Sequence, residues 1–309
     1  MLEWVREGAK SLPHPLLMRL YAQVHRWREQ RLGEQARRRA GVPSLGEFDL
    51  GRIKGSDTLF VLGSGASINH IPAERWKVVA RHDTVGFNFW LFHPFVPKIY
   101  FFESLARDNP AYKTLLDALA ERADGYAETL KVIMDMEPPR ESLFELPAGI
   151  RRNLYAAKTI SMLARNEREL AAAVAYLVRS GAFRQTPRFD SLLKYNGSVS
   201  SVISLGIRMG YRRIVLCGID MTRAEYFYQD AALYPERQDI PWLPQDRDAK
   251  HHTYTSNPWM VPMDLVIAEL TRTVLEPAKI ELYVESRSSA LWPKVPEAPE
   301  SLWTEQQSS

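Results

Sequence analysis

The chain has 309 residues, of which 45% are hydrophobic and 25% are charged, and its net charge is +3. These values are ordinary for a globular domain and too weakly basic to indicate nucleic-acid binding. Cys217 is the single cysteine, which excludes an internal disulfide and a zinc site built from cysteines. No stretch approaches the roughly 18 apolar residues of a membrane-spanning helix, and no signal peptide opens the chain, so we expect a cytoplasmic protein.

The first 50 residues predict a basic helical extension to the rest of the chain. Residues 1–45 contain nine Lys and Arg against four Glu, an excess of five positive charges. Apolar residues recur there at helical spacing: Leu16, Leu17, Leu20, Tyr21, Val24 and Trp27. A basic amphipathic helix of this kind either binds an anionic membrane surface or packs on its own domain with its arginines in solvent. Both interpretations stay open. If the helix binds a membrane, we expect the cytoplasmic protein to lie peripherally on the inner membrane face.

Residues 58–69, TLFVLGSGASIN, predict a first β-strand that feeds a tight turn of small residues. Gly63 and Gly65 permit backbone angles closed to other residues and let a phosphate or ribose lie against the main chain. Ser64 and Ser67 add hydroxyls at the mouth of the turn. The spacing G-x-G-x-S falls short of the dinucleotide fingerprint G-x-G-x-x-G, so a nucleotide-handling loop and a plain strand-to-helix turn are both open.

Two further strand signals follow, at residues 84–88 and 98–103, and they end at Asn88 and Glu103. Polar residues at the carboxyl ends of neighbouring strands lie where open α/β sheets bind ligands. Residues 104–190 predict helices around one strand, 130–134. Strands that alternate with helices indicate a mostly parallel sheet that is covered on both faces.

A second informative block runs from residue 194 to residue 220. Asn196, Gly197 and Ser198 resemble a helix N-cap, whose free backbone N–H groups suit an anion, and a helix through residue 209 follows. RIVLCGID, which begins at residue 213, is a near-continuous apolar run typical of a central parallel strand. Two further site candidates stand at the carboxyl end of that strand: Gly218 and Asp220.

Residues 221–262 differ in composition from the preceding blocks. They contain tyrosines and tryptophans among prolines, polar residues and the pair His251-His252. A long aperiodic segment after the carboxyl end of a strand is usually a lid or substrate loop. A helix from 264 to 274 and a strand from 279 to 285 follow. The Pro- and Glu-rich residues 293–309 predict a flexible tail. The main domain is therefore expected to span residues 51–292.

In their order along the chain, these blocks resemble the bacterial sialyltransferases of glycosyltransferase family 42. FVLGSGASI is similar to the family's opening strand and nucleotide loop, VGFNFW to its second-strand element and IYFFE to its third strand. The strongest piece is NGSVSSVISLGIRMGYRRIVLCGIDM, and KIELYVESRSSALW is similar to the last strand and the turn after it. The resemblance covers residues 58–292 and leaves the N-terminal helix outside.

The resemblance implies a Rossmann-like variant of the glycosyltransferase A fold with a lid, a CMP-activated sialic acid as donor, and no metal. It also implies roles for single residues. These are Ser64, Gly65, Asn88 and Ser198 at the donor, Tyr228 at the leaving phosphate, and His252 or His251 as the general base.

Two positions depart from the family's pattern. The third strand ends in Glu103 where the family has Asn, and a carboxylate there repels a CMP phosphate unless it binds sugar hydroxyls. Thr222 occupies the place of one of two phosphate-binding tyrosines, although Tyr226 lies close by in the sequence.

We therefore predict a metal-independent glycosyltransferase without a cofactor. It would transfer a CMP-activated nonulosonic or ulosonic acid, sialic acid or a relative such as Kdo, to a cell-surface glycan or glycolipid, as in lipopolysaccharide or capsule synthesis. Hydroxyls and helix N–H groups would stabilise the leaving phosphate, and a histidine with a pKa near 7 would take the acceptor proton.

Two alternatives stay open on the same residues. One is a nucleotide enzyme related to the pterin pyrophosphokinases and motility accessory factors, which share the glycine loop and should prefer purine triphosphates with Mg²⁺. The other is a non-catalytic scaffold that keeps a degenerate nucleotide fold. The sequence predicts no nucleic-acid partner and leaves a homo-oligomer open.

Overall fold

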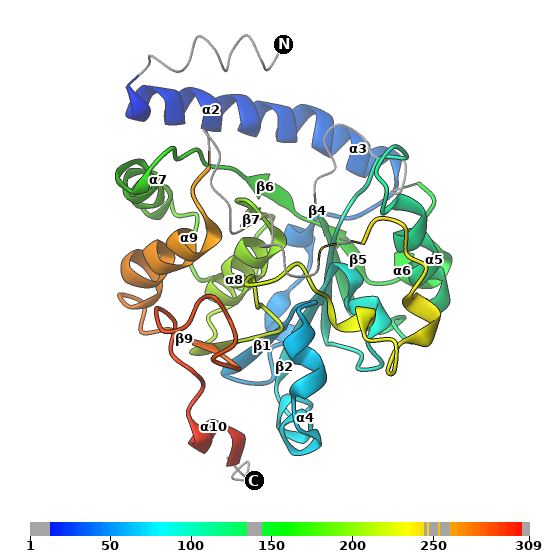
Figure 1. The fold of residues 1–309 in the computed structure, drawn as a ribbon. Helices are drawn as coiled ribbons and strands as arrows, with labels where there is room; N and C mark the ends of the chain where they lie inside the picture. Colours follow the sequence, from blue (N-terminus) through cyan, green and yellow to red (C-terminus); the bar gives the residue numbers. More distant parts are fainter. Residues whose placement is uncertain (1–12, 135–143, 244–245, 247–252, 254–259, 305–309) are drawn as a thin grey trace.

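The computed structural model describes residues 13–134, 144–243, 246, 253 and 260–304, and Figure 1 shows the path of the chain. Within these residues, seven strands form one sheet in the order β5-β4-β3-β2-β1-β8-β9, and every neighbouring pair is parallel. A second, two-stranded sheet pairs β6 with β7. The strands are β1 (Thr58–Leu62), β2 (Asp83–Phe87), β3 (Ile99–Glu103), β4 (Leu130–Met134), β5 (Leu154–Ala156), β6 (Lys158–Ile160), β7 (Ser191–Leu193), β8 (Arg213–Cys217) and β9 (Glu281–Val284).

Helices cover both faces of the large sheet (Figure 1), which confirms the predicted α/β architecture. The helices α7, α8 and α9 contribute to one hydrophobic core, and α4, α5, α6 and α10 contribute to the other. The α-helices are α2 (His14–Arg28), α3 (Glu34–Arg39), α4 (Ala73–Val79), α5 (Tyr112–Arg122), α6 (Ala148–Arg151), α7 (Glu167–Arg179), α8 (Ser198–Arg208), α9 (Met263–Leu270) and α10 (Glu300–Thr304).

Strands β1 and β8, at the centre of the sheet, are almost entirely apolar because both of their faces are buried. In β1, Leu59 and Val61 join the core under α8, whereas Phe60 and Leu62 join the core on the opposite face. Successive side chains of a strand point to opposite faces, so a strand covered on both sides needs apolar residues at every position. Cys217, at the end of β8, is fully buried as a small core residue, and this burial raises the pKa of its thiol.

The order of the strands places a switch point beside β1. From β1 the chain moves outward through β2, β3, β4 and β5, and it then returns to the other side of β1 to form β8 and β9. The connections that leave the carboxyl ends of β1 and β8 therefore run in opposite directions. This divergence opens a crevice, which is where open α/β sheets bind ligands.

Two expectations about the outer parts of the chain need correction. Residues 104–190 hold β5 and β6 in addition to β4; both are three residues long, too short to show a strand pattern in the sequence. Residues 293–304 are not a flexible tail, because they pair with β9 and end in α10. Leu302 and Trp303 of α10 are buried, and the Trp303 ring lies 5.6 Å from that of Phe60.

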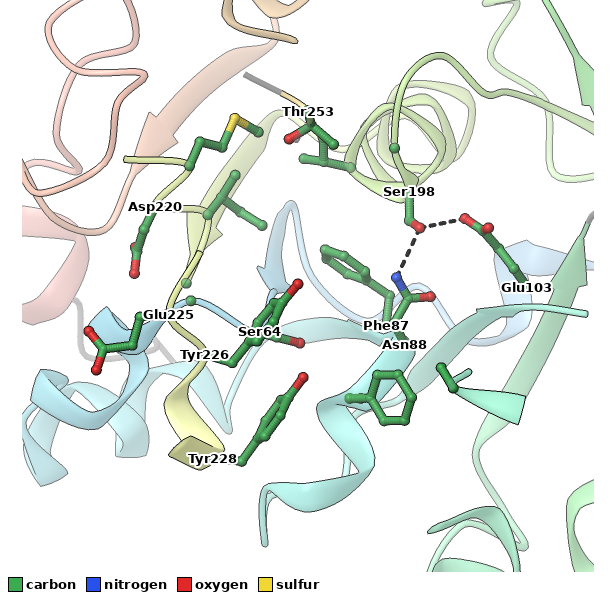
Figure 2. Close-up of a pocket in the computed structure, with 18 of the residues that line it drawn as sticks. Ser64, Phe87, Asn88, Glu103, Ser198, Asp220, Glu225, Tyr226, Tyr228 and Thr253 are labelled. Carbon is green, nitrogen blue, oxygen red and sulfur yellow. Dashed lines mark hydrogen bonds between the residues drawn. The ribbon is translucent and has the colours of Figure 1, made fainter. Parts of the chain in front are cut away.

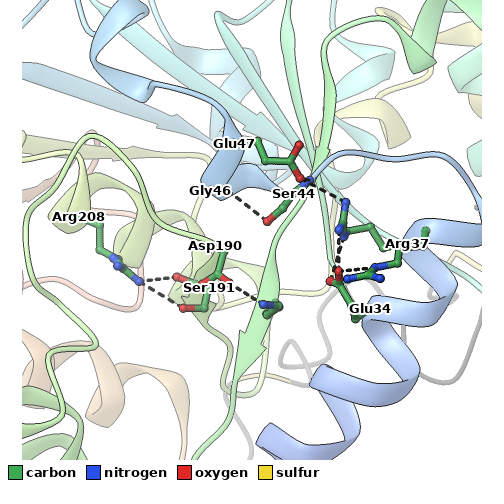
Figure 3. Close-up of polar contacts among 10 residues, drawn as sticks. Glu34, Arg37, Ser44, Gly46, Glu47, Asp190, Ser191 and Arg208 are labelled. Atoms are coloured by element: carbon green, nitrogen blue, oxygen red, sulfur yellow. Dashed lines mark hydrogen bonds and ion pairs between the residues drawn. The ribbon is translucent and has the colours of Figure 1, made fainter.

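Helix α2 lies across β6 and α7 (Figure 1), and polar contacts join α3 to the segment that follows it (Figure 3). Arg37 binds Glu34 with two nitrogens, at 2.7 and 3.0 Å, and donates to the carbonyl of Val42 at 2.7 Å. Ser44 and Glu47 then form a reciprocal capping box, and Ser44 pairs with Ala156 of β5. The segment that follows α3 is thereby joined to the edge of the large sheet.

Candidate functional site

A pocket of about 510 Å³ lies at the switch point, at the carboxyl ends of β1, β2, β3 and β8. The sequence had singled out many of the residues around it. Those that line it are Ser64, Gly65, Asn88, Glu103, Gly197, Ser198, Gly218, Asp220, Tyr226 and Tyr228. The other predicted residues that the structure describes, Gly63, Ser67 and Asn196, do not line it.

The glycine turn after β1 packs against the turn after β8. The Gly63 amide donates to the Cys217 carbonyl and the Gly65 amide to the Gly218 carbonyl, both at 2.8 Å. A Cβ at Gly63 would lie 2.6 Å from the Gly218 oxygen, and one at Gly65 would lie 2.4 Å from an Asp220 oxygen. Neither Gly63 nor Gly65 has a positive φ. These glycines therefore permit a close approach of two loops, and the unusual backbone angles expected from the sequence are not present.

Hydrogen bonds between Ser67 and Asp220 join the same two loops. The Ser67 hydroxyl donates to Asp220 Oδ1 at 2.5 Å, and the Ser67 amide donates to Asp220 Oδ2 at 2.9 Å. Ser67 lies in the short 3-10 helix η4 (Ala66–His70) that follows the glycine turn. Its hydroxyl is committed to Asp220, so the structure gives it a role in holding the turn.

A polar wall joins the ends of β2 and β3 to the start of α8 (Figure 2). Ser198 donates to Glu103 at 2.6 Å and accepts from the Asn88 side-chain amide at 3.0 Å. Lys194 pairs with the other Glu103 oxygen at 2.7 Å. Asn88 has a positive φ of 51° and its carbonyl accepts from the Tyr100 hydroxyl at 2.5 Å. A non-glycine residue in this conformation is uncommon and is concentrated at functional sites.

The amino-terminal end of α8 opens on the pocket. Gly197 is the N-cap, with a φ of 147°, and as a glycine it has no side chain that could cap the helix. The Asn196 side chain donates instead to the Thr253 carbonyl at 3.2 Å. The first N–H groups of an α-helix lack intrahelical partners and carry a partial positive charge. An anion in the pocket could therefore bind at Ser198, the first helical residue.

Aromatic residues form the opposite side of the pocket, which we call the aromatic wall: Phe89, Tyr226, Tyr228 and Trp242. The rings of Tyr226 and Tyr228 are stacked, with centroids 5.3 Å apart and planes 4° from parallel. Their hydroxyls point the same way in Figure 2. Burial raises the pKa of the Tyr228 phenol well above its usual value, so this hydroxyl stays a protonated donor. Thr222, by contrast, is exposed.

The tyrosine pair is held in place by the glycine turn. Tyr226 forms an isolated antiparallel bridge with Gly65, and the Phe227 amide donates to the Ser64 carbonyl at 3.0 Å. The Asn69 side chain donates to the Phe227 carbonyl at 2.8 Å. The short helix η7 (Phe227–Gln229) is therefore joined to the loop after β1, and this contact fixes where both tyrosines stand.

The described residues that line the pocket carry no excess of positive charge. Among its described lining residues, Glu103, Asp220 and Glu225 are acidic, and Lys194 and Arg223 are basic. Binding of an anion there would depend on backbone N–H groups and hydroxyls more than on net charge. Within the part of the chain that the structure describes, no three His, Cys, Asp or Glu side chains gather in a way that could hold a metal ion.

Several lining residues had not been identified from the sequence: Phe89, Lys194, Arg223, Glu225, Trp242 and Thr253. Lys194 adjoins the NGS block, and Thr253 directly follows the predicted base, so proximity in the sequence was an available signal for these two. His251 and His252 themselves lie outside the described residues.

Comparisons with known proteins find only distant structural similarity. No family model matches the chain, and no curated protein matches it. Monofunctional alpha-2,3-sialyltransferase Cst-I from Campylobacter jejuni is 14% identical, with a TM-score of 0.43 over 80% of this chain and 82% of that one. Sialyltransferase CstII from the same organism, in complex with the substrate analogue CMP-3FNeuAc, is 15% identical, with a TM-score of 0.39 over 78% and 86%.

Both matched structures are sialyltransferases, the enzyme class that the sequence motifs resemble. The similarity is too distant to transfer an activity. The residues of the pocket therefore have to support any function on their own.

Proposed function

We propose that the protein is a metal-independent glycosyltransferase that uses a CMP-activated nonulosonic or ulosonic acid as donor and a glycan or glycolipid as acceptor. The observation that supports this most is the pairing of two kinds of anion-binding group around one pocket. The amino-terminal end of α8 lies on one side, and the hydroxyls of the stacked tyrosines Tyr226 and Tyr228 lie on the other.

This arrangement suits the departure of a phosphate. When the bond from the sugar to CMP breaks, negative charge develops on the phosphate oxygens. Donors that already point at that place stabilise the charge without further reorganisation, and removing one such donor typically slows a reaction by about 10²–10³-fold. In this proposal Tyr226 supplies the second tyrosine hydroxyl, because it lines the pocket and Thr222 does not.

Glu103 takes the sugar side of the donor in the proposal. Its carboxylate already accepts from Ser198 and pairs with Lys194. A carboxylate accepts hydrogen bonds from hydroxyl groups, which a ulosonic acid carries in number, and repels the donor's own negative groups. Glu103 therefore favours a donor that presents hydroxyls at the end of β3, with its phosphate between the first N–H groups of α8 and the tyrosines.

The proposed general base is His252, with His251 as the second candidate. His252 precedes Thr253 in the sequence, and Thr253 lines the pocket. Histidine is suited to taking the acceptor proton because its usual pKa of about 6.5 lies near neutral pH.

Nucleotide preference tests this proposal against the triphosphate-using alternative. We expect isothermal titration to show that CMP binds more tightly than ATP or GTP, and that Mg²⁺ leaves the CMP affinity unchanged. Tighter binding of a purine triphosphate that requires Mg²⁺ would contradict the proposal and favour a pyrophosphokinase-like enzyme.

A non-catalytic scaffold is the second candidate, and one observation favours it. The polar groups of Asn88, Glu103, Lys194 and Ser198 already satisfy one another. A scaffold would bind CMP without releasing it from any CMP-sugar, so turnover separates the two candidates.

A further inference from the structure

Helix α2 carries an exposed apolar stripe along one face. Leu16, Leu20, Val24 and Trp27 are 48%, 44%, 50% and 53% exposed. Their spacing of four, four and three residues places them on one side of an α-helix. On the opposite side, Met18 is 3% exposed, because it packs into the core of the domain. Helix α2 therefore has two apolar faces. One packs on the domain and the other is exposed to solvent.

Polar contacts fix the orientation of this stripe. His14 bonds the Leu163 carbonyl at 3.0 Å, and the Leu163 amide donates to the sulfur of Met18 at 3.1 Å. The His25 ring lies 3.3 Å from the Ser161 hydroxyl. These contacts hold both ends of α2 against the segment after β6. The outward face is consequently presented by a rigid helix and does not depend on a conformational change.

Basic residues accompany the stripe, and α2 contains no acidic residue. Arg19 and Arg26 are exposed and, at 100° per residue, both lie along one edge of the apolar face. Arg31, just beyond α2, is exposed and places its guanidinium 5.7 Å from the centre of the Trp27 ring. An apolar face edged by arginines is complementary to a bilayer surface that carries anionic headgroups.

We propose that α2 docks this protein on an anionic lipid bilayer, with Leu20, Trp27 and their neighbours in the interface and the arginines at the headgroups. Charge selects the bilayer over a second copy of the chain, because facing copies of α2 would bring arginines together. The helix lies in the surface and does not cross it: no helix among the described residues is long and apolar enough to span a membrane.

The test is flotation of the full-length protein with vesicles of phosphatidylcholine alone or mixed with phosphatidylglycerol. We expect binding only to the mixed vesicles, and weaker binding as salt is raised. The double substitution Leu20→Ser/Trp27→Ser should lower the partition coefficient at least about tenfold, because both apolar side chains leave the interface. Arg19→Gln/Arg26→Gln should lower it by about 30-fold. The matched control, Leu233→Ser, changes a leucine that is 56% exposed outside α2 and should have no effect.

Three results would overturn the proposal. One is equal binding of wild type to both kinds of vesicle, or to neither. Another is a lower thermal midpoint of Leu20→Ser/Trp27→Ser without lipid, which would show that protein covers the stripe. The third is a concentration-dependent dimer that the same variant abolishes. The readouts are binding and stability, so this proposal stands or falls separately from the proposed transferase.

Discussion

Glu103 is the residue whose charge sets the character of the pocket, since it is bound to both Ser198 and Lys194. Glu103→Gln removes one negative charge and keeps an oxygen that can accept from Ser198. We expect CMP to bind about five- to tenfold more tightly at low salt, because a repulsion near the phosphate is gone. Turnover of a CMP-sugar should fall at the same time, because the sugar hydroxyls lose their acceptor.

Titration calorimetry and steady-state kinetics on one preparation measure these two opposite effects. Glu121→Gln is the matched control, since Glu121 pairs with Arg237 and does not line the pocket. A loss of CMP affinity in Glu103→Gln, comparable to its loss of turnover, would show that the carboxylate does not act on the sugar alone.

His93 is expected to make stability depend on pH. Burial, together with the nearby Arg122 charge, lowers the pKa of its ring to about 4, and its Nδ1 accepts from the Phe95 amide at 3.1 Å. The unfolded chain has a histidine pKa near 6.5, so below that pH the unfolded state takes up a proton that the folded state refuses. Stability is therefore full above about pH 6.5 and is lost as the pH falls toward 4, by at most about 1.4 kcal/mol per pH unit.

Urea unfolding at pH 7 and pH 5 measures this loss. In His93→Gln the difference between the two pH values should shrink, whereas it should persist in His70→Gln, which changes an exposed histidine. An unchanged difference in His93→Gln would assign the acid sensitivity to other groups.

At the scale of elements, the glycine turn after β1 acts through its packing on the turn after β8. Gly63→Ala would place a Cβ 2.4 Å from the Ile219 side chain and 2.6 Å from the Gly218 oxygen. We expect a destabilisation of about 1–3 kcal/mol, because overpacked backbone must shift. Gly125→Ala, whose Cβ would meet nothing closer than 3.7 Å, should change stability by less than about 0.5 kcal/mol. Thermal and urea unfolding check both; full stability with lost CMP binding in Gly63→Ala would instead make the turn a phosphate cradle.

The strands that could be predicted are those formed by a continuous run of apolar residues. β1, β4 and β8 are five-residue runs buried on both faces, and their apolar content alone indicates them. β5, β6 and β7 each have three residues. They form because another segment of the chain pairs with them; Ala156 of β5, for example, pairs with Ser44. Pairing over such distances leaves no periodic signal in the sequence.

The same distinction holds at the candidate site. Asn88 and Glu103 could be chosen because polar residues at strand ends gather at one edge of a parallel sheet. The commitment of Ser67 to Asp220 could not, because it joins residues 153 positions apart. The contact between Trp242 and Phe89, whose ring centroids are 4.6 Å apart, could not be predicted from the sequence either.

On the scale of the whole molecule, one framework of strands and helices carries two surfaces with different properties. The switch point beside β1 holds the pocket, and α2 lies across β6 and α7 (Figure 1). β6 pairs with β7, which leads directly to Lys194 and the start of α8. Helix α2, bound to a bilayer, and the proposed transferase pocket would thus belong to one framework. This arrangement suits a soluble donor and an acceptor that is held in the membrane.

Release of CMP from CMP-Neu5Ac and from CMP-Kdo, measured in the presence of EDTA, tests the central claim most directly. We predict that the wild type releases CMP from at least one donor and that EDTA has no effect. Tyr228→Phe should slow release by about 10²–10³-fold, and His252→Ala should slow transfer by about 10²–10⁴-fold with little change in CMP affinity. Tyr283→Phe, on β9 and outside the pocket lining, should behave as wild type. Binding of CMP without release from either donor, or release that Tyr228→Phe leaves unchanged, would contradict the proposed transferase.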